Sequence, residues 1–111
     1  MRWYDKIIAA HTAVTNDVSH GYAIKKDRYM VWLEDDENDF VVGGKHVERA
    51  IPGSTDIFTK TEFDPWVDDL RAAFEAYGIL YRLNSKQFEE DTGFWHTEFL
   101  WEVADEWEAN S

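Results

Sequence analysis

One amphipathic pattern organises the middle of the chain, between residues 55 and 81. Residues 56–60 predict a strand, and a helix is predicted after it. Asp64 is a suitable N-cap, Pro65 suits the first helical turn, and Gly78 suits the position that closes a helix. The apolar positions between these marks form one stripe on one helix face: Trp66, Leu70, Ala73, Phe74 and Tyr77. Because this stripe needs a sheet or another helix beneath it, the pattern predicts a two-layer α+β domain.

The chain before this unit predicts one short helix and several strands. Apolar residues recur at helical spacing over residues 3–14, which predicts a short amphipathic helix. Residues 18–24 predict a short strand in which Gly21 marks a bulge or a close backbone approach. Residues 28–33 are apolar on both faces, a pattern typical of a central strand.

Two glycine-containing dipeptides follow, and the first of them predicts a turn. Gly43-Gly44 is a hairpin-type dipeptide after a short apolar run. Pro52-Gly53 is either a second turn or an irregularity within one long edge strand, and the pattern leaves both interpretations open.

Two further strands are predicted after the main helix. The first covers residues 79–83. In residues 95–103 apolar and polar positions alternate, which predicts a strand with one buried face. The residues that share this face are Trp95, Thr97, Phe99, Trp101 and Val103. Residues 104–111 are acidic apart from Trp107, and we expect this tail to fray.

The predicted order is helix, strand, strand, strand pair, helix, strand, strand. Short turns between strands favour antiparallel pairing. The expected architecture is therefore a single α+β domain over residues 1–111. It consists of a mostly antiparallel sheet with one main helix packed on one face and a short N-terminal helix.

Composition limits the class of protein. The chain has 111 residues, of which 44% are hydrophobic and 16% aromatic, so intrinsic disorder is not expected. So many aromatic side chains in a small domain predict that some face a partner. There is no cysteine, which excludes disulfides and zinc-thiolate sites. With no apolar run long enough to span a membrane and no signal-peptide pattern, we expect a soluble protein that is cytoplasmic at synthesis.

The charge of the chain further limits the class of protein to which it can belong. Lys and Arg number 11 against 23 Asp and Glu, for a net charge of −12, which argues against a basic footprint for nucleic acid. Five carboxylates fall within residues 34–39. They predict a solvated loop, or one that meets a cation or a basic partner.

No motif indicates catalysis or a metal site. The four histidines, His11, His20, His46 and His96, lack the spacing of a helical ligand pair, so structural or surface roles are expected. The acidic run from Asp35 lacks the glycine of a calcium loop at its sixth position and has His46 at the twelfth. No serine stands in a nucleophile elbow. We therefore expect a protein that is not an enzyme and needs no cofactor or metal.

Several short motifs, taken in order and spacing, resemble a family. The chain is similar to the small tail-completion or tail-terminator proteins of the neck in long-tailed phages of Gram-positive bacteria. The similarity covers about residues 18–103, and its most specific parts are residues 55–60, 77–81 and 88–96. The weaker matches are residues 18–22, 29–32, 38–40 and 43–44.

The resemblance implies an α+β subunit that assembles into a ring, expected to be a hexamer. Such a ring caps the tail tube and joins it to the head connector. The implied partners are other copies of the chain and the tail-tube and connector proteins, with no sequence-specific nucleic-acid binding and no membrane. The implied location is the host cytoplasm during assembly and then the neck of the virion. The candidate interface or lumen residues are Glu34, Asp35, Asp36, Glu37, Asp39, Phe88, Glu89, Glu90 and Asp91.

Two other classes remain open. An acidic inhibitor that mimics DNA would present carboxylates in place of phosphates to a nuclease or restriction enzyme, and the net charge favours it. A metal-dependent enzyme using His20, His46 or His96 would need a bound metal.

Overall fold

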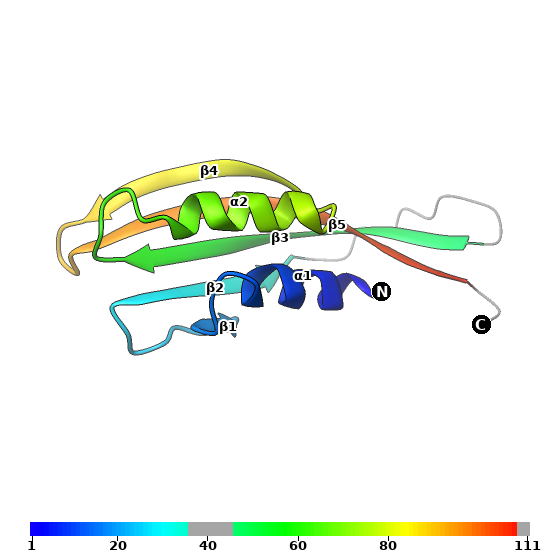
Figure 1. Cartoon of the computed structure of the whole chain (residues 1–111), viewed down its shortest axis with the longest axis horizontal. Coiled ribbons are helices and arrows are strands. Elements are labelled where there is room, and N and C mark those ends of the chain that lie inside the picture. The colour runs from blue at the N-terminus through cyan, green and yellow to red at the C-terminus, as the bar shows by residue number, and fades with distance from the viewer. Residues whose placement is uncertain (36–45, 109–111) are drawn as a thin grey trace.

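The structure is a computed structural model that describes the backbone of residues 1–35 and 46–108 and the side chains of residues 1–35 and 49–105. Within this part of the chain, two helices lie on a five-stranded sheet, so the fold is α+β as predicted (Figure 1). In chain order the elements are α1 (Trp3–Thr12), β1 (Val18–His20), β2 (Arg28–Glu34), β3 (His46–Thr59), α2 (Trp66–Ala76), β4 (Leu80–Glu89) and β5 (Phe94–Glu108).

The sheet has the strand order β1-β2-β3-β5-β4 and is mostly antiparallel. The exception is β1, which pairs in parallel with β2. Parallel neighbours normally need a crossover of a dozen or more residues. Here a shorter loop is enough because β1 has only three residues. The strand predicted over residues 18–24 ends early because Gly21, at φ 86°, turns the chain away.

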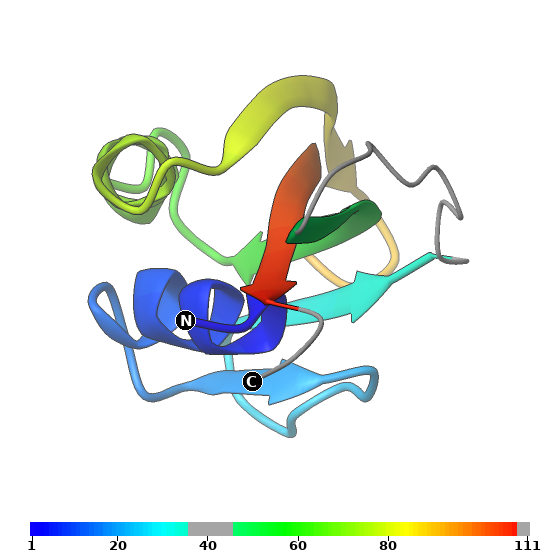
Figure 2. The ribbon, with the colours of Figure 1, turned by 90° about the vertical axis from the view of Figure 1, so that its right-hand side faces the viewer.

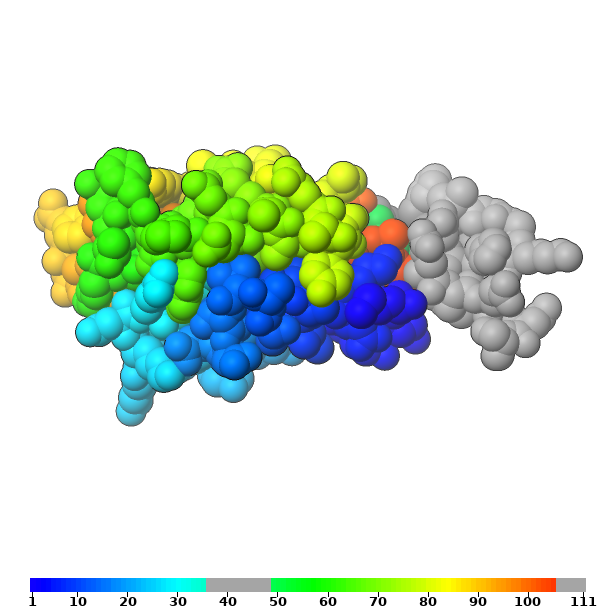
Figure 3. Space-filling model, viewed as in Figure 1, coloured from blue at the N-terminus to red at the C-terminus, as the bar shows by residue number. Residues whose placement is uncertain are grey.

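Both helices cover the same face of the sheet, which leaves the other face open (Figure 2). The core lies between these two layers. Ile7 and Ala10 from α1 and Leu70 and Phe74 from α2 pack against alternate residues of the strands. The alternation predicted for residues 95–103 is confirmed for Thr97, Phe99, Trp101 and Val103, which are buried, whereas Trp95 is only half-buried. In the space-filling view the two helices lie side by side along an elongated body (Figure 3).

Helix α2 begins and ends as its sequence predicts. Asp64 Oδ1 accepts the N–H of Trp66 at 2.9 Å. At the other end Gly78 has φ 69°, and the N–H of Ile79 reaches the carbonyl of Phe74 at 2.9 Å, which closes the helix as a Schellman motif. One member of the predicted stripe is wrong: Tyr77, the C-cap residue just after α2, is 37% exposed.

Strand β3 is a single long strand, which settles the question of Pro52 and Gly53. It lies between β2 and β5, so it is a central strand, and both the turn and the long edge strand considered for Pro52-Gly53 are wrong. Pro52 stands just beyond the β2 ladder, where its carbonyl accepts the N–H of Asp35 at 2.7 Å. Because β2 ends there, the missing N–H of Pro52 costs little pairing.

The prediction that the acidic tail frays is wrong for residues 104–108. β5 continues to Glu108, and β3 pairs with it along this whole length (Figure 1). The cause is Asp105, which is fully buried although it is a carboxylate. It accepts two hydrogen bonds from Arg2, both at 2.9 Å, and one from Arg49 at 3.1 Å. These contacts tie the last strand to the start of α1.

Strand β4 is twice as long as predicted and forms one edge of the sheet. Its second half is polar, and the pairing register shifts between Leu83 and Ser85, so simple alternation does not reveal it. Among the residues that the structure describes, neither helix is long and apolar enough to cross a membrane.

Candidate functional site

The structure separates the predicted interface residues into two sets. Glu34 and Asp35 stand at the end of β2, beside Gly53 of β3. Phe88 and the residues after it stand at the turn between β4 and β5, level with Thr59 of β3. These positions of β3 are six residues apart, so the two sets are separated by about 20 Å. Asp36, Glu37 and Asp39 lie outside the described residues, as do Gly43-Gly44 and all of the run compared with a calcium loop except Asp35.

At the first of these ends, Glu34 is held by His20. The Nε2 of His20 donates to Glu34 Oε1 at 2.5 Å, and the imidazole stacks on Trp32 with ring centroids 4.0 Å apart. Burial opposes ionisation of Glu34, but the hydrogen bonds from His20 and from a backbone N–H hold its pKa below the usual value. This carboxylate is therefore charged and held in one position.

A groove runs beside this pair, between α1 and the strands β1 and β2. It has a volume of about 460 Å³. Trp32 forms part of its lining together with Trp3, Tyr4 and Ile8 of α1, and Glu34 contributes a carboxylate. We call it the α1 groove. Mostly aromatic and aliphatic walls with a few placed polar groups are the usual character of a binding groove.

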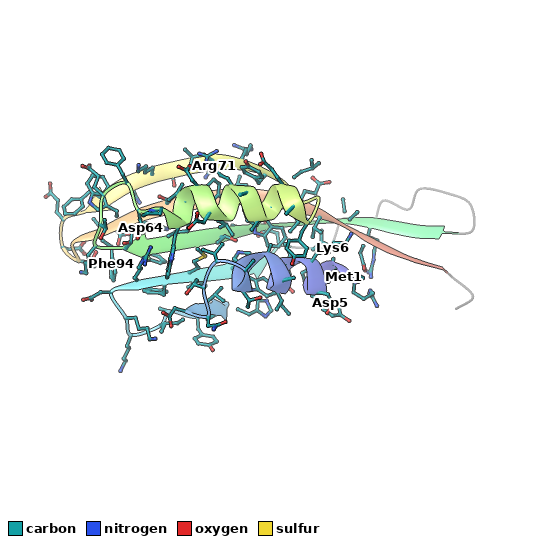
Figure 4. All side chains as sticks on the ribbon, in the orientation of Figure 1. Met1, Asp5, Lys6, Asp64, Arg71 and Phe94 are labelled. Carbon is teal, nitrogen blue, oxygen red and sulfur yellow. The ribbon has the colours of Figure 1, made fainter. Side chains whose placement is uncertain are left out.

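At the opposite end of the sheet, aromatic rings gather on the open face. Phe58 stacks on Tyr29 at 4.9 Å and on His96 at 4.3 Å between ring centroids, and Phe94 meets Phe58 edge-on at 5.8 Å. Figure 4 shows Phe94 and Asp64 at this end of the molecule, far from Met1. Tyr29 is buried by these neighbours, which raises its pKa.

His96 lies between two carboxylates on this face. Its Nε2 is 2.6 Å from Asp56 Oδ1, and its Nδ1 is 3.1 Å from Glu89 Oε2. A carboxylate can only accept, so both contacts are made only by the doubly protonated ring. The hydrogen bond to Asp56, helped by Glu89, accordingly raises the pKa of His96. Glu89, predicted as an interface residue, is thus engaged inside its own subunit.

The open face also carries an apolar patch, which we call the leucine patch. Leu33, Leu80 and Leu100 come from three strands near the Glu34 end of the sheet. Leu80 is 72% exposed and Leu33 is 49% exposed. Leu80 and Leu100 line a second groove, of about 350 Å³, to which Arg82 contributes a cation and Asp35 and Glu102 contribute carboxylates. No helix covers this face in the part of the chain described (Figure 2).

The loop from β3 to α2 carries a residue that the sequence did not single out. Phe63 is 77% exposed, the largest exposure of any large hydrophobic side chain in the described residues. Its φ of 57° is in the left-handed region, which is unfavourable for a bulky residue. Lys86 Nζ lies 4.7 Å from the centre of its ring. The sequence signal that could have indicated an exposed Phe63 is its place between Glu62 and Asp64, at the polar start of a helix.

Asp64 anchors the loop between β3 and α2. It accepts hydrogen bonds from Arg28 at 2.5 and 2.8 Å and from Thr59 at 2.6 Å, in addition to its cap on α2. Burial opposes its ionisation, but these bonds lower the pKa of Asp64 overall. The guanidinium of Arg28 also lies over the ring of Trp66 at 3.9 Å. The loop that presents Phe63 is therefore firmly anchored.

The histidines are not brought together. His11 is buried, whereas His20 and His96 each bind carboxylates at separate places, and the side chain of His46 lies outside the described residues. Residues 1–35 and 49–105 contain no cluster of His, Asp and Glu that is arranged to hold a metal ion. Compared with known proteins, the chain matches no family model and no curated protein.

Proposed function

We propose that this protein is a structural assembly subunit of a phage or prophage neck, a tail-completion or tail-terminator ring subunit that joins the tail tube to the head connector. The proposal combines the resemblance of residues 18–103 to that family with one structural observation. That observation is the leucine patch on the uncovered sheet face, which presents large apolar side chains to solvent where a partner would bury them.

The distribution of exposed apolar residues supports assembly into a ring. A ring of identical subunits uses heterologous contacts, in which two different surfaces of each subunit meet. The leucine patch and Phe63 lie toward opposite ends of the sheet, so one subunit offers two separate contact surfaces. An acidic ring would also repel the phosphate backbone of DNA passing through it.

An acidic DNA mimic is the second candidate, and the net charge of −12 is the observation that favours it. A mimic needs carboxylates that are free to bind a basic partner. Several carboxylates here are engaged within the subunit by Arg or His, namely Glu34, Asp56, Asp64, Glu89 and Asp105. This internal pairing makes the mimic the weaker of the two proposals.

The test is assembly of the purified chain, measured by native mass spectrometry and sedimentation velocity over a range of concentrations. The chain is studied alone and with the tail-tube and connector proteins encoded beside it. We expect the wild-type chain to form a closed ring. The variant Leu80→Asp should weaken assembly by at least about 10-fold, because it removes an apolar contact. Asp69→Ser, at an exposed position of α2 on the opposite face of the sheet, is the matched control.

Two results would overturn the proposal. One is a chain that stays monomeric in all these mixtures. The other is a chain that binds a basic DNA-binding enzyme and is displaced by duplex DNA, which would establish the mimic instead.

A further inference from the structure

We propose that the outer edge of β4, at residues 80–83, binds an extended peptide segment of a partner protein as an added strand. The segment that fits is one in which acidic and apolar side chains alternate, with the acidic ones facing α2. This inference goes beyond the proposed function, because it concerns a peptide and not the contact between folded subunits of a ring.

The two edges of the sheet differ in what they offer to another chain. β1 forms one edge and has only three residues, so it presents little backbone for pairing. β4 forms the other edge with ten residues, and no strand pairs with its outer side in the part of the chain described. Alternate residues of such an edge direct their N–H and C=O groups away from the sheet. β4 is therefore the edge at which strand addition, a common mode of peptide recognition, can occur.

Only the first half of β4 is open to such pairing. The second half is protected as edge strands often are, because the register shifts between Leu83 and Ser85 and a lysine, Lys86, follows. Residues 80–83 pair regularly with β5 and have neither feature. Here Leu80 is 72% exposed and Leu83 is 42% exposed. An unprotected edge with exposed leucines is a template for pairing with another chain.

A groove lies on each side of this edge. On the side of the helices, a groove of about 520 Å³ lies between α2 and the start of β4, and Arg71 and Glu75 line it. We call it the α2 groove. On the open face lies the second groove described above, and the two grooves share Leu80, Tyr81 and Arg82. Because successive side chains of a strand point to opposite faces, an added strand would direct alternate side chains into the two grooves.

The α2 groove favours an acidic side chain. It contains two cations, Arg71 and Arg82, and one carboxylate, Glu75, which accepts a hydrogen bond from the hydroxyl of Tyr81 at 3.1 Å. Arg71 also contacts Asp68 at 3.6 Å, but the Asp68 side chain is 90% exposed, and a surface pair of this kind contributes little. The guanidinium of Arg71 is therefore able to bind a carboxylate of the peptide.

The second groove favours an apolar side chain. Leu80 and Leu100 form its apolar wall. Its charged residues are Arg82 and two carboxylates, Asp35 and Glu102, so an acidic side chain would meet a net negative charge there. Together the two grooves select a strand with acidic residues on one face and apolar residues on the other.

The net charge of the chain favours the opposite kind of peptide. At −12, the chain as a whole would attract a basic peptide. At physiological ionic strength, however, exposed charges more than about 8 Å apart are largely screened, so the side chains at the edge determine the interaction. The preference for an acidic or a basic peptide therefore distinguishes a built site from general attraction.

NMR titration with a synthetic peptide tests the site. The probe has about seven residues and blocked ends, and Val alternates with Asp along it. At pH 7 and about 0.15 M salt, we expect a dissociation constant below about 1 mM, with the amide shifts concentrated at residues 80–83. A peptide with Lys in place of Asp should bind at least about 10-fold more weakly. The inference is refuted by no binding, by shifts confined to other parts of the chain, or by a Lys peptide that binds as tightly.

Arg71→Glu tests the charge of the α2 groove. This variant should bind the Asp peptide at least about 10-fold more weakly than the wild type and should bind the Lys peptide more tightly. Lys25→Glu is the matched control, since it makes the same change in net charge at an exposed position between β1 and β2, near the opposite edge of the sheet. Equal effects of the two substitutions would refute recognition by the groove. Circular dichroism confirms folding, and Arg71→Gln replaces Arg71→Glu if the latter is not folded.

Two N-methylated forms of the Asp peptide test the backbone pairing. One carries methyl groups on the odd-numbered residues and the other on the even-numbered residues. Only every second N–H of an added strand faces β4, so one form should lose at least about 10-fold in affinity while the other binds like the parent peptide. Equal affinities of the two forms would refute strand addition. A chain that forms a ring but binds none of these peptides would refute this inference and leave the proposed function intact.

Discussion

Acid destabilisation through His11 is a prediction that the structure makes in detail. His11 is fully buried on the inner face of α1, and both ring nitrogens make hydrogen bonds. Nδ1 lies 2.7 Å from the carbonyl of Ile7, and Nε2 lies 2.7 Å from the hydroxyl of Thr55. The carbonyl accepts only, so Nδ1 carries the proton and Nε2 accepts from Thr55. That hydroxyl in turn accepts from Trp101 Nε1 at 2.9 Å, which completes a neutral network.

Burial lowers the pKa of His11 to about 4, although the bond to Ile7 opposes this. In the unfolded chain its pKa is near 6.5. Between these two values the unfolded state binds the proton and the folded state does not. Stability is therefore complete above pH 6.5 and is lost as the pH falls toward 4. The full loss is about 3 kcal/mol, and about 1 kcal/mol of it falls between pH 7 and pH 5.5.

Urea denaturation followed by tryptophan fluorescence at pH 7 and pH 5.5 measures this effect. The comparison is with His11→Gln, which cannot take up the proton. His11→Gln should be less stable at pH 7, and between pH 7 and pH 5.5 it should lose about 1 kcal/mol less than the wild type, because the contribution of His96 is the same in both. The carboxylates with lowered pKa values, such as Asp64 and Asp105, lose their contribution only nearer pH 4 and do not disturb this interval.

The exposed His20 provides the matched control. His20→Gln leaves the buried ring in place, so between pH 7 and pH 5.5 it should still lose about 1 kcal/mol more than His11→Gln does. Equal pH dependence in the wild type and His11→Gln would refute the reasoning, since it would mean that His11 is not a buried neutral ring.

Three further predictions concern stability and use the same denaturation assay. Gly53→Ala should lower the free energy of unfolding by about 2 kcal/mol or more, because an added Cβ would lie 2.3 Å from the ring of Trp101. Gly78→Ala has open space around the added Cβ and should cost only about 1 kcal/mol of backbone strain. An equal loss in the two variants would contradict the steric cause. Asp105→Ala should cost about 3 kcal/mol, since it breaks a buried ion-pair network, and a loss below about 1 kcal/mol would show that β5 does not depend on it. His96 has a raised pKa, so its stabilising contribution is present below pH 6.5 and is lost as the pH rises through the folded-state value. His96→Gln should remove that loss. If the stability of this variant depends on pH as that of the wild type does, the pairing of His96 with Asp56 and Glu89 is refuted.

The candidate site depended on distances that a sequence does not contain. Glu34 and Glu89 were singled out as acidic residues of an interface, but each binds a histidine of its own subunit. Their partners lie on other strands, His20 on β1 and His96 on β5. Phe63 was missed because its importance lies in its exposure and its positive φ, neither of which follows from residue type.

The sequence by itself determined the elements whose signals are local. The α2 helix followed from its apolar stripe and from Asp64 and Gly78 at its ends, and the start of β5 followed from strict alternation, because periodicity and capping act within a few residues. Only the tertiary structure decided the rest. The tail joined β5 because Arg2, more than a hundred positions away, neutralises the buried Asp105, and β4 was extended by pairing with β5 across a bulge. Such contacts form between residues far apart in the chain, so their free energy depends on the completed fold.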